Sequence, residues 1–107
     1  MSELTNETMK AFKIIFCEYK ARMSKGFTKE NSIVFEDGTI ESLPQFSEWL
    51  RPDINSAISE LKYNEFIFED VIGNRKLTDP GIKYMEAKPK EFFNDLKSLF
   101  DIVSILV

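Results

Sequence analysis

The pattern of apolar and polar positions is most regular between residues 51 and 87. Apolar residues recur there first at steps of three and four, which predicts a helix that buries one stripe, formed by Ile54, Ala57, Ile58 and Leu61. The segment FIFEDV, residues 66–71, then leaves the helical period and suits a strand. Gly73 and Asn74 tolerate the positive φ of a tight turn. The stretch therefore predicts a helix followed by a β-hairpin.

A second helix is expected after the hairpin, because Thr78 can cap a helix whose first turn holds Pro80. The ending LTDPGIKYMEA resembles that of small bacterial winged helix-turn-helix proteins, including MarR-like and PadR-like regulators and the YjcQ-like family. In those proteins the wing is followed by a Leu-Thr-x-x-Gly-x-x pattern and two apolar residues, matched here by Leu77, Thr78, Gly81, Tyr84 and Met85. The resemblance implies a recognition helix, a wing and DNA binding.

Glu65 departs from this family pattern, which usually has Gly at the corner between the recognition helix and the wing. Helices commonly end with a residue in the left-handed conformation, and after Gly it is Asn that adopts this conformation most readily. We therefore expect Asn64 to be the left-handed residue at this corner.

Residues 4–25 carry a second regular pattern, which predicts one long amphipathic helix with Thr5 as its cap and Gly26 as its stop. Its apolar stripe consists of Met9, Phe12, Phe16, Tyr19 and Met23. Ile14 and Cys17 lie off this stripe, so we expect half-buried positions for them, the alternative being a second interface.

The segment that follows the long helix is less regular. Residues 27–43 are expected to form a short hairpin that turns at Asp37 and Gly38. Its apolar partners would be Ile33, Phe35 and Ile40. A simple winged helix usually has a single strand here, so the hairpin would be an elaboration.

Residues 44–50 predict a short supporting helix that carries Phe46, Trp49 and Leu50 on one face. Trp49 is expected in the core or at a subunit contact. Arg51 precedes Pro52 and should therefore be extended, which would place the break between the supporting helix and the recognition helix there.

Residues 89–107 predict a last helix with a wide apolar stripe. The residues of this stripe that we expect to form a dimer interface are Phe92, Phe93, Leu96, Leu99, Phe100, Val103 and Leu106. A monomer of this size would struggle to cover so much apolar surface, so we predict a homodimer. Membrane-surface binding is the alternative, but the polar face mixes Asn94, Asp95, Lys97 and Asp101 rather than being basic.

The composition limits the classes of protein to which the chain can belong. With 107 residues, 43% of them hydrophobic, it has room for one domain with one core. A lone Cys17 and the absence of His exclude an internal disulfide and nearly every transition-metal site. No residues form a catalytic arrangement, so we predict neither an enzyme nor a bound cofactor. Because the chain has no signal pattern and no apolar run of membrane-spanning length, we expect a cytoplasmic protein.

The net charge of −4 gives little electrostatic support to DNA binding. The candidate DNA-binding residues face away from the buried stripe of the recognition helix or lie on the wing: Arg51, Asn55, Ser56, Ser59, Lys62, Tyr63, Arg75 and Lys76. Hydroxyl and amide groups can read base edges, whereas Arg51, Arg75 and Lys76 would contact phosphates. The alternatives are a solvated helix surface, and wing cations that only keep a hairpin tip soluble.

Together these patterns predict a mainly α fold with small β-hairpins, a winged helix-turn-helix with long N-terminal and C-terminal helices. The single domain, 1–107, would comprise an N-terminal helix (1–26), a hairpin insertion (27–43), the helix-turn-helix and wing (44–87) and a C-terminal dimerisation helix (89–107). The expected function is that of a bacterial or phage-derived transcriptional regulator that binds double-stranded DNA as a dimer. The alternative is an acidic winged-helix module that binds a protein partner and no DNA.

Overall fold

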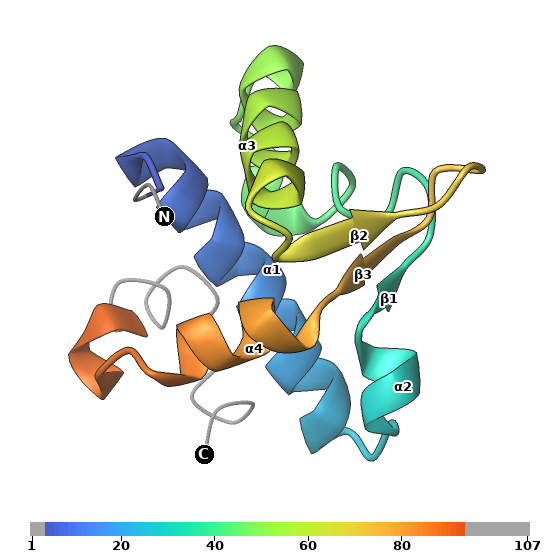
Figure 1. Cartoon of the computed structure of the whole chain (residues 1–107), viewed down its shortest axis with the longest axis vertical. Coiled ribbons are helices and arrows are strands. Elements are labelled where there is room, and N and C mark those ends of the chain that lie inside the picture. Colours follow the sequence, from blue (N-terminus) through green and yellow to red (C-terminus); the bar gives the residue numbers. More distant parts are fainter. Residues whose placement is uncertain (1–3, 94–107) are drawn as a thin grey trace.

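A computed structural model describes residues 4–93, which form a mainly helical structure with a small three-stranded antiparallel sheet (Figure 1). The helices are α1 (Asn6–Ser24), α2 (Lys29–Ser32), α3 (Arg51–Tyr63) and α4 (Asp79–Glu86), with 3-10 turns η1 (Pro44–Phe46) and η2 (Lys90–Phe93). The strands are β1 (Val34–Phe35), β2 (Ile67–Glu69) and β3 (Arg75–Leu77). The prediction of a mainly helical fold with a minor β component is confirmed.

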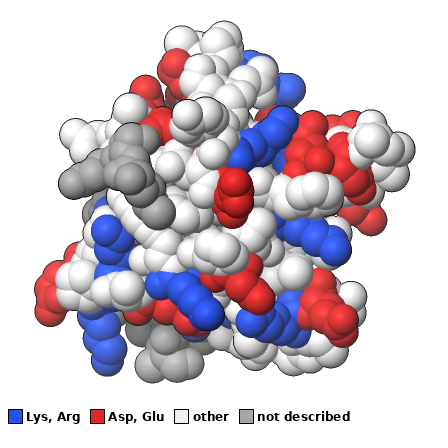
Figure 2. All heavy atoms as spheres, in the orientation of Figure 1, with Lys and Arg blue, Asp and Glu red and all other residues white. Residues whose placement is uncertain are grey.

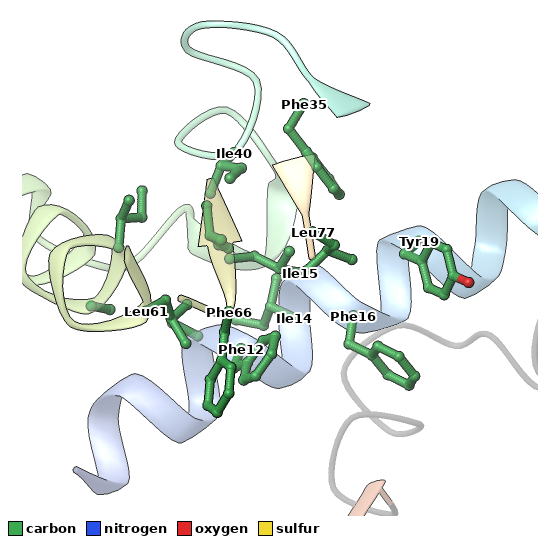
Figure 3. Packing of buried hydrophobic residues seen from close by; sticks show 14 of the residues in the cluster. Phe12, Ile14, Ile15, Phe16, Tyr19, Phe35, Ile40, Leu61, Phe66 and Leu77 are labelled. Atoms are coloured by element: carbon green, nitrogen blue, oxygen red, sulfur yellow. The ribbon is translucent and has the colours of Figure 1, made fainter. Parts of the chain in front are cut away.

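Helix α1 crosses the middle of the structure and is buried around most of its circumference (Figures 1 and 3). Thr5 caps it as predicted, because its side chain accepts a hydrogen bond from the Thr8 amide at 3.2 Å. Ile14 and Cys17 are 4% and 3% exposed, so the prediction of half-buried positions is wrong. The reason is that α2, α3 and α4 all pack against α1, which leaves it with more than one buried side.

An aromatic stack joins three parts of the chain in the core. The ring centroids of Phe12 in α1 and Phe66 at the start of the hairpin are 5.6 Å apart, and those of Phe66 and Tyr84 in α4 are 4.7 Å apart. Figure 3 shows Phe12 and Phe66 side by side beneath the sheet. The base of the β2–β3 hairpin is therefore attached to both α1 and α4.

The predicted hairpin in residues 27–43 is wrong, although the apolar residues assigned to it are buried or packed against the core. Residues 29–32 form α2, and β1 pairs with β3 rather than with a returning strand of its own. After the turn at Gly38, Ser42 bonds back to the Gly38 carbonyl through both its amide (3.2 Å) and its hydroxyl (2.8 Å). These local bonds close successive turns and leave no extended backbone for a second strand.

The supporting helix predicted for residues 44–50 is shortened to the single turn η1. Phe46 is buried and meets Trp49 edge to face at 5.0 Å, but Leu50 is 68% exposed. Leu50, not Arg51, is the extended residue before α3, with φ −75° and ψ 142°. Arg51 is the first residue of α3, and Pro52 lies in the first turn, where a missing amide hydrogen costs no helical hydrogen bond.

The sheet has the order β1-β3-β2, so the long-range strand β1 and the hairpin strand β2 flank β3. At the turn of the hairpin Gly73 has φ 97°, as predicted, but Asn74 does not have a positive φ. Asn74 is held instead by Asp70, whose Oδ1 accepts the Asn74 amide at 2.9 Å and whose own amide donates to the Asn74 carbonyl at 2.9 Å. The turn is therefore closed by an Asp side chain and one glycine.

The corner between α3 and β2 is formed by Glu65, which has φ 63°. Asn64, with φ −85°, is not left-handed, so the prediction for this corner is wrong by one residue. The amides of Glu65 and Phe66 donate to the carbonyls of Lys62 (3.0 Å) and Leu61 (2.9 Å), which closes the end of the helix. Glu65, the residue at which the sequence departs from the expected glycine, is thus the left-handed residue of this corner.

Replacing Glu65 with Gly is expected to stabilise the fold by roughly 0.5–1 kcal/mol. A left-handed residue with a Cβ costs about 1–2 kcal/mol, and the extra freedom of Gly in the unfolded chain offsets part of that gain. Urea unfolding followed by circular dichroism measures the change. Asn64→Gly is the matched control and should lower stability, because Asn64 has φ −85° and its Nδ2 donates to the Glu60 carbonyl at 2.9 Å. An unchanged or lower stability of Glu65→Gly would contradict the backbone conformation described here.

Candidate nucleic-acid interface

Helix α3 has one fully buried stripe and an exposed outer face. The predicted stripe is confirmed, since four residues are 0–3% exposed: Ile54, Ala57, Ile58 and Leu61. The predicted DNA-contacting residues of this helix are all exposed: Arg51, Asn55, Ser56, Ser59, Lys62 and Tyr63. Tyr63, near the C-terminal end of the helix, is 83% exposed. The structure therefore brings these six side chains together on the outside of one helix.

Glu60 does not belong to this outer face, because its carboxylate faces the beginning of α1. It accepts hydrogen bonds from the Thr5 amide at 3.1 Å, from the Thr5 hydroxyl at 3.1 Å and from the Thr8 hydroxyl. The bond from Thr8, followed by those from Thr5, holds the pKa of Glu60 below its usual value against the opposing effect of burial. This carboxylate therefore ties α3 to α1 through its hydrogen bonds with Thr5 and Thr8.

Arg75 lies in an ion-pair network rather than on the surface, so the structure does not place it as a phosphate contact. Its Nη1 is 2.8 Å from Glu41 Oε2 and its Nε is 3.1 Å from Glu69 Oε1, and its side chain is only 12% exposed. Burial lowers the pKa of Arg75, but the hydrogen bonds and charges of Glu41 and Glu69 raise it further, so the guanidinium stays charged. The charge of Arg75 is therefore already compensated by Glu41 and Glu69.

Lys62 and Lys76 differ in how free they are to contact a ligand. Lys62 Nζ lies 3.3 Å from Glu69 Oε1, so part of its charge is already compensated. Burial raises the pKa of Glu69, but the hydrogen bonds and charges of Arg75 and Lys62 outweigh it and leave that pKa lowered. Lys76 is exposed on β3, opposite Phe68 of β2. Of the two predicted wing cations, Lys76 alone keeps an exposed side chain.

The tip of the hairpin is apolar, which the sequence analysis missed. Val71 and Ile72 are 103% and 70% exposed, and Phe68 is 58% exposed on the strand that leads to them. Figure 2 shows acidic side chains gathered near this end of the molecule, where Glu69 and Asp70 flank the tip. The available signal was the segment DVIGN, which places two apolar residues inside a turn. An apolar tip with acidic neighbours is unlike a phosphate-binding wing.

Most residues of the predicted dimer interface lie outside the described residues: Leu96, Leu99, Phe100, Val103 and Leu106. Phe93 is the last residue of η2. Phe92 is half-buried and packs against the core of its own chain, with Lys13 Nζ 4.1 Å and Lys88 Nζ 5.5 Å from its ring centroid.

No family model, curated protein or solved structure matches this chain. Residues 4–93 contain no helix that is both long and apolar enough to cross a membrane. Within the same residues, no three His, Cys, Asp or Glu side chains are grouped so that they could hold a metal ion.

Proposed function

We propose that the chain is a winged helix-turn-helix protein that regulates transcription by placing α3 in the major groove of double-stranded DNA. The observation that carries this proposal is the outer face of α3, where hydroxyl, amide and cationic groups are exposed along one side of a helix whose other side is buried. Such groups can donate to and accept from base edges. The sheet order β1-β3-β2 supports the winged-helix class, as does the element order α1, α2, β1, η1, α3, β2, β3, α4, in which α2 is an added turn before β1.

The distribution of charge limits how this DNA binding would work. Arg51 and Lys62 lie near the two ends of α3 and are the natural phosphate contacts, with Lys76 on the hairpin. Arg75 is held by Glu41 and Glu69 and contributes none of its charge to phosphates. A single copy would therefore bind weakly, and two copies on a pseudo-palindromic site would supply the missing affinity. Light scattering measures whether the full chain is a homodimer.

Selection of duplexes from a random pool by the full chain tests the proposal, with Ser59→Glu as the decisive variant. Ser59 lies in the middle of the exposed face, so a carboxylate there would meet base edges and phosphates. We expect Ser59→Glu to weaken binding to the selected duplex by about tenfold or more without changing the unfolding midpoint. Ser47→Glu adds the same charge at an exposed residue outside α3 and should bind like the parent.

Binding of the parent should also fall steeply as salt is added, since phosphate contacts release counterions. Failure to enrich any duplex at low salt would refute DNA binding by this chain. Selection of the same duplex by the Ser59 variant with equal affinity would refute the assignment of α3 as the reading element.

A second function, binding of a protein partner, is favoured by the hairpin. Val71 and Ile72 expose apolar side chains at its tip, beside Glu69 and Asp70. The charge of the nearby Arg75 is compensated by Glu41 and Glu69. Exposed apolar groups with polar neighbours are typical of protein-protein contact surfaces. This function would stand if no duplex were bound at low salt while a defined peptide bound the hairpin.

A further inference from the structure

The last turn of α3 packs beside strand β2, and an ion pair joins the two elements (Figure 1). Lys62 Nζ on α3 lies 3.3 Å from Glu69 Oε1 on β2. Lys62 also belongs to the exposed face of α3 for which we propose DNA binding. A cation of the proposed DNA-binding face is therefore already in contact with an anionic oxygen of its own chain.

Glu69 Oε1 is shared between two cations. Arg75 Nε donates to the same oxygen at 3.1 Å, and Arg75 Nη1 donates to Glu41 Oε2 at 2.8 Å. If Lys62 moved away, Glu69 Oε1 would keep the hydrogen bond from Arg75. The departure of Lys62 would therefore leave no carboxylate and no guanidinium of this network without a partner.

The two cations that share Glu69 differ in how freely their side chains can move. The Lys62 side chain is 42% exposed, whereas the Arg75 side chain is 12% exposed. The lysine ammonium is carried on a flexible four-carbon chain, and ion pairs that are exposed to water contribute little to stability. Lys62 can therefore leave Glu69 for another anion at low cost, while Arg75 stays in place.

A groove of about 490 Å³ gives an incoming anion access to this ion pair, because Lys62 and Glu69 both line it. A phosphate diester offers an ammonium group the same kind of charged oxygen acceptor that a carboxylate offers. When a helix lies in the major groove, cations near its ends reach the phosphates that border the groove. A phosphate of bound DNA is therefore the anion that would meet Lys62.

We infer that in the free chain Glu69 occupies the position that a DNA phosphate takes at Lys62, so that DNA binding exchanges one anion for the other. The exchange rests on the proposed function, DNA binding by α3, and it makes the Lys62–Glu69 ion pair an autoinhibitory contact. Glu69 competes with DNA for Lys62 and lowers the affinity of the parent chain. After the exchange Glu69 remains bonded to Arg75.

Glu69→Gln tests the exchange, with Glu65→Gln as the matched control, on a duplex selected by the full chain. Both variants remove one negative charge from the same groove, but within residues 4–93 no ion pair engages Glu65. Glu69→Gln should raise the affinity for the duplex about threefold more than Glu65→Gln does, because it alone frees Lys62. A Gln at this position can still accept the hydrogen bond from Arg75, so the variant should fold, which circular dichroism verifies.

The same two substitutions in a Lys62→Met background show whether the gain comes from Lys62. In that background Glu69→Gln and Glu65→Gln should raise the affinity equally, since there is no ammonium group to release. NMR of the unsubstituted chain gives a second measurement. Addition of the duplex should shift the signals of the Lys62 side chain, whereas the Arg75 Nε–H should keep its chemical shift because it stays bonded to Glu69.

The outcomes separate this exchange from DNA binding itself. Equal gains from Glu69→Gln and Glu65→Gln, a larger gain from Glu69→Gln that persists without Lys62, or displacement of Arg75 in place of Lys62 would each overturn the exchange and leave DNA binding by α3 intact. Absence of duplex binding by the parent and by every variant would refute the proposed function and the exchange with it. Binding by Glu69→Gln but not by the parent would support both.

Discussion

Replacing Gly81 with Ala is expected to destabilise the fold by about 3 kcal/mol. A Cβ at this position would lie 2.5 Å from the Phe66 carbonyl oxygen, closer than non-bonded atoms approach, and 3.1 Å from the Phe66 Cα, which is also a tight contact. The atoms that the Cβ would meet belong to the backbone of Phe66, whose carbonyl accepts a hydrogen bond from the Thr78 amide at 3.1 Å. The start of β2 therefore cannot shift away without breaking that hydrogen bond. The better helix propensity of Ala recovers only about 1 kcal/mol. Urea unfolding of both proteins measures the loss.

Lys83→Ala is the control for this prediction, because Lys83 is exposed on the same helix α4. It changes the helix composition without adding an atom near the hairpin and should leave stability within about 0.5 kcal/mol of the parent. If Gly81→Ala were as stable as Lys83→Ala, the close approach of α4 to the start of β2 would not exist in solution.

The contact between Gly81 and the Phe66 backbone explains why the helix after the hairpin could be predicted from the sequence. Thr78 caps α4, Gly81 allows the approach to Phe66, and Tyr84 stacks on the Phe66 ring at 4.7 Å. Leu77 and Met85 are 2% and 0% exposed. Each residue of the quoted pattern therefore has a local structural role, and roles of this kind depend on residue type and spacing, which a sequence contains.

The segment between α1 and α3 could not be predicted in the same way. Burial of Phe35 and Ile40 follows from their apolar character, but the choice of a partner strand does not. Strand β1 pairs with β3, about forty positions further along the chain, while Ser42 and Gly38 close local turns where a returning strand was expected. Non-local pairing competes here with local hydrogen bonds, and the sequence pattern alone does not decide between them.

The exposed residues of the candidate site could be predicted from the helical period. The ion pairs of its cations could not. Exposure of Ser59 and Tyr63 follows from the buried stripe on the other side of α3. The ion pair that holds Arg75 away from the surface could not be predicted from this period, because its partner Glu41 lies 34 residues earlier in the sequence. A net charge counts Arg75 as a free cation, although the fold surrounds it with carboxylates.

Replacing Arg75 with Met is expected to destabilise the fold by about 3 kcal/mol, in contrast to the small effect of removing a surface phosphate contact. The Glu41 side chain is 8% exposed, and its Oε1 is buried without a hydrogen-bond partner in the described part of the chain. Its other oxygen depends on Arg75 at 2.8 Å. Without Arg75 this carboxylate would remain buried and uncompensated, so unfolding in urea should occur at a lower concentration.

Two further variants distinguish this network from a general effect of losing charge. Lys76→Met removes the neighbouring exposed cation and should change stability by less than about 0.5 kcal/mol. The double variant Arg75→Met with Glu41→Leu should recover much of the loss, because removing both members of a buried pair leaves no unpaired charge. If Arg75→Met had no more effect than Lys76→Met, or if the double variant were less stable than Arg75→Met alone, Arg75 would not be held by Glu41 as described. It would then be free to contact phosphate, as the sequence pattern predicts.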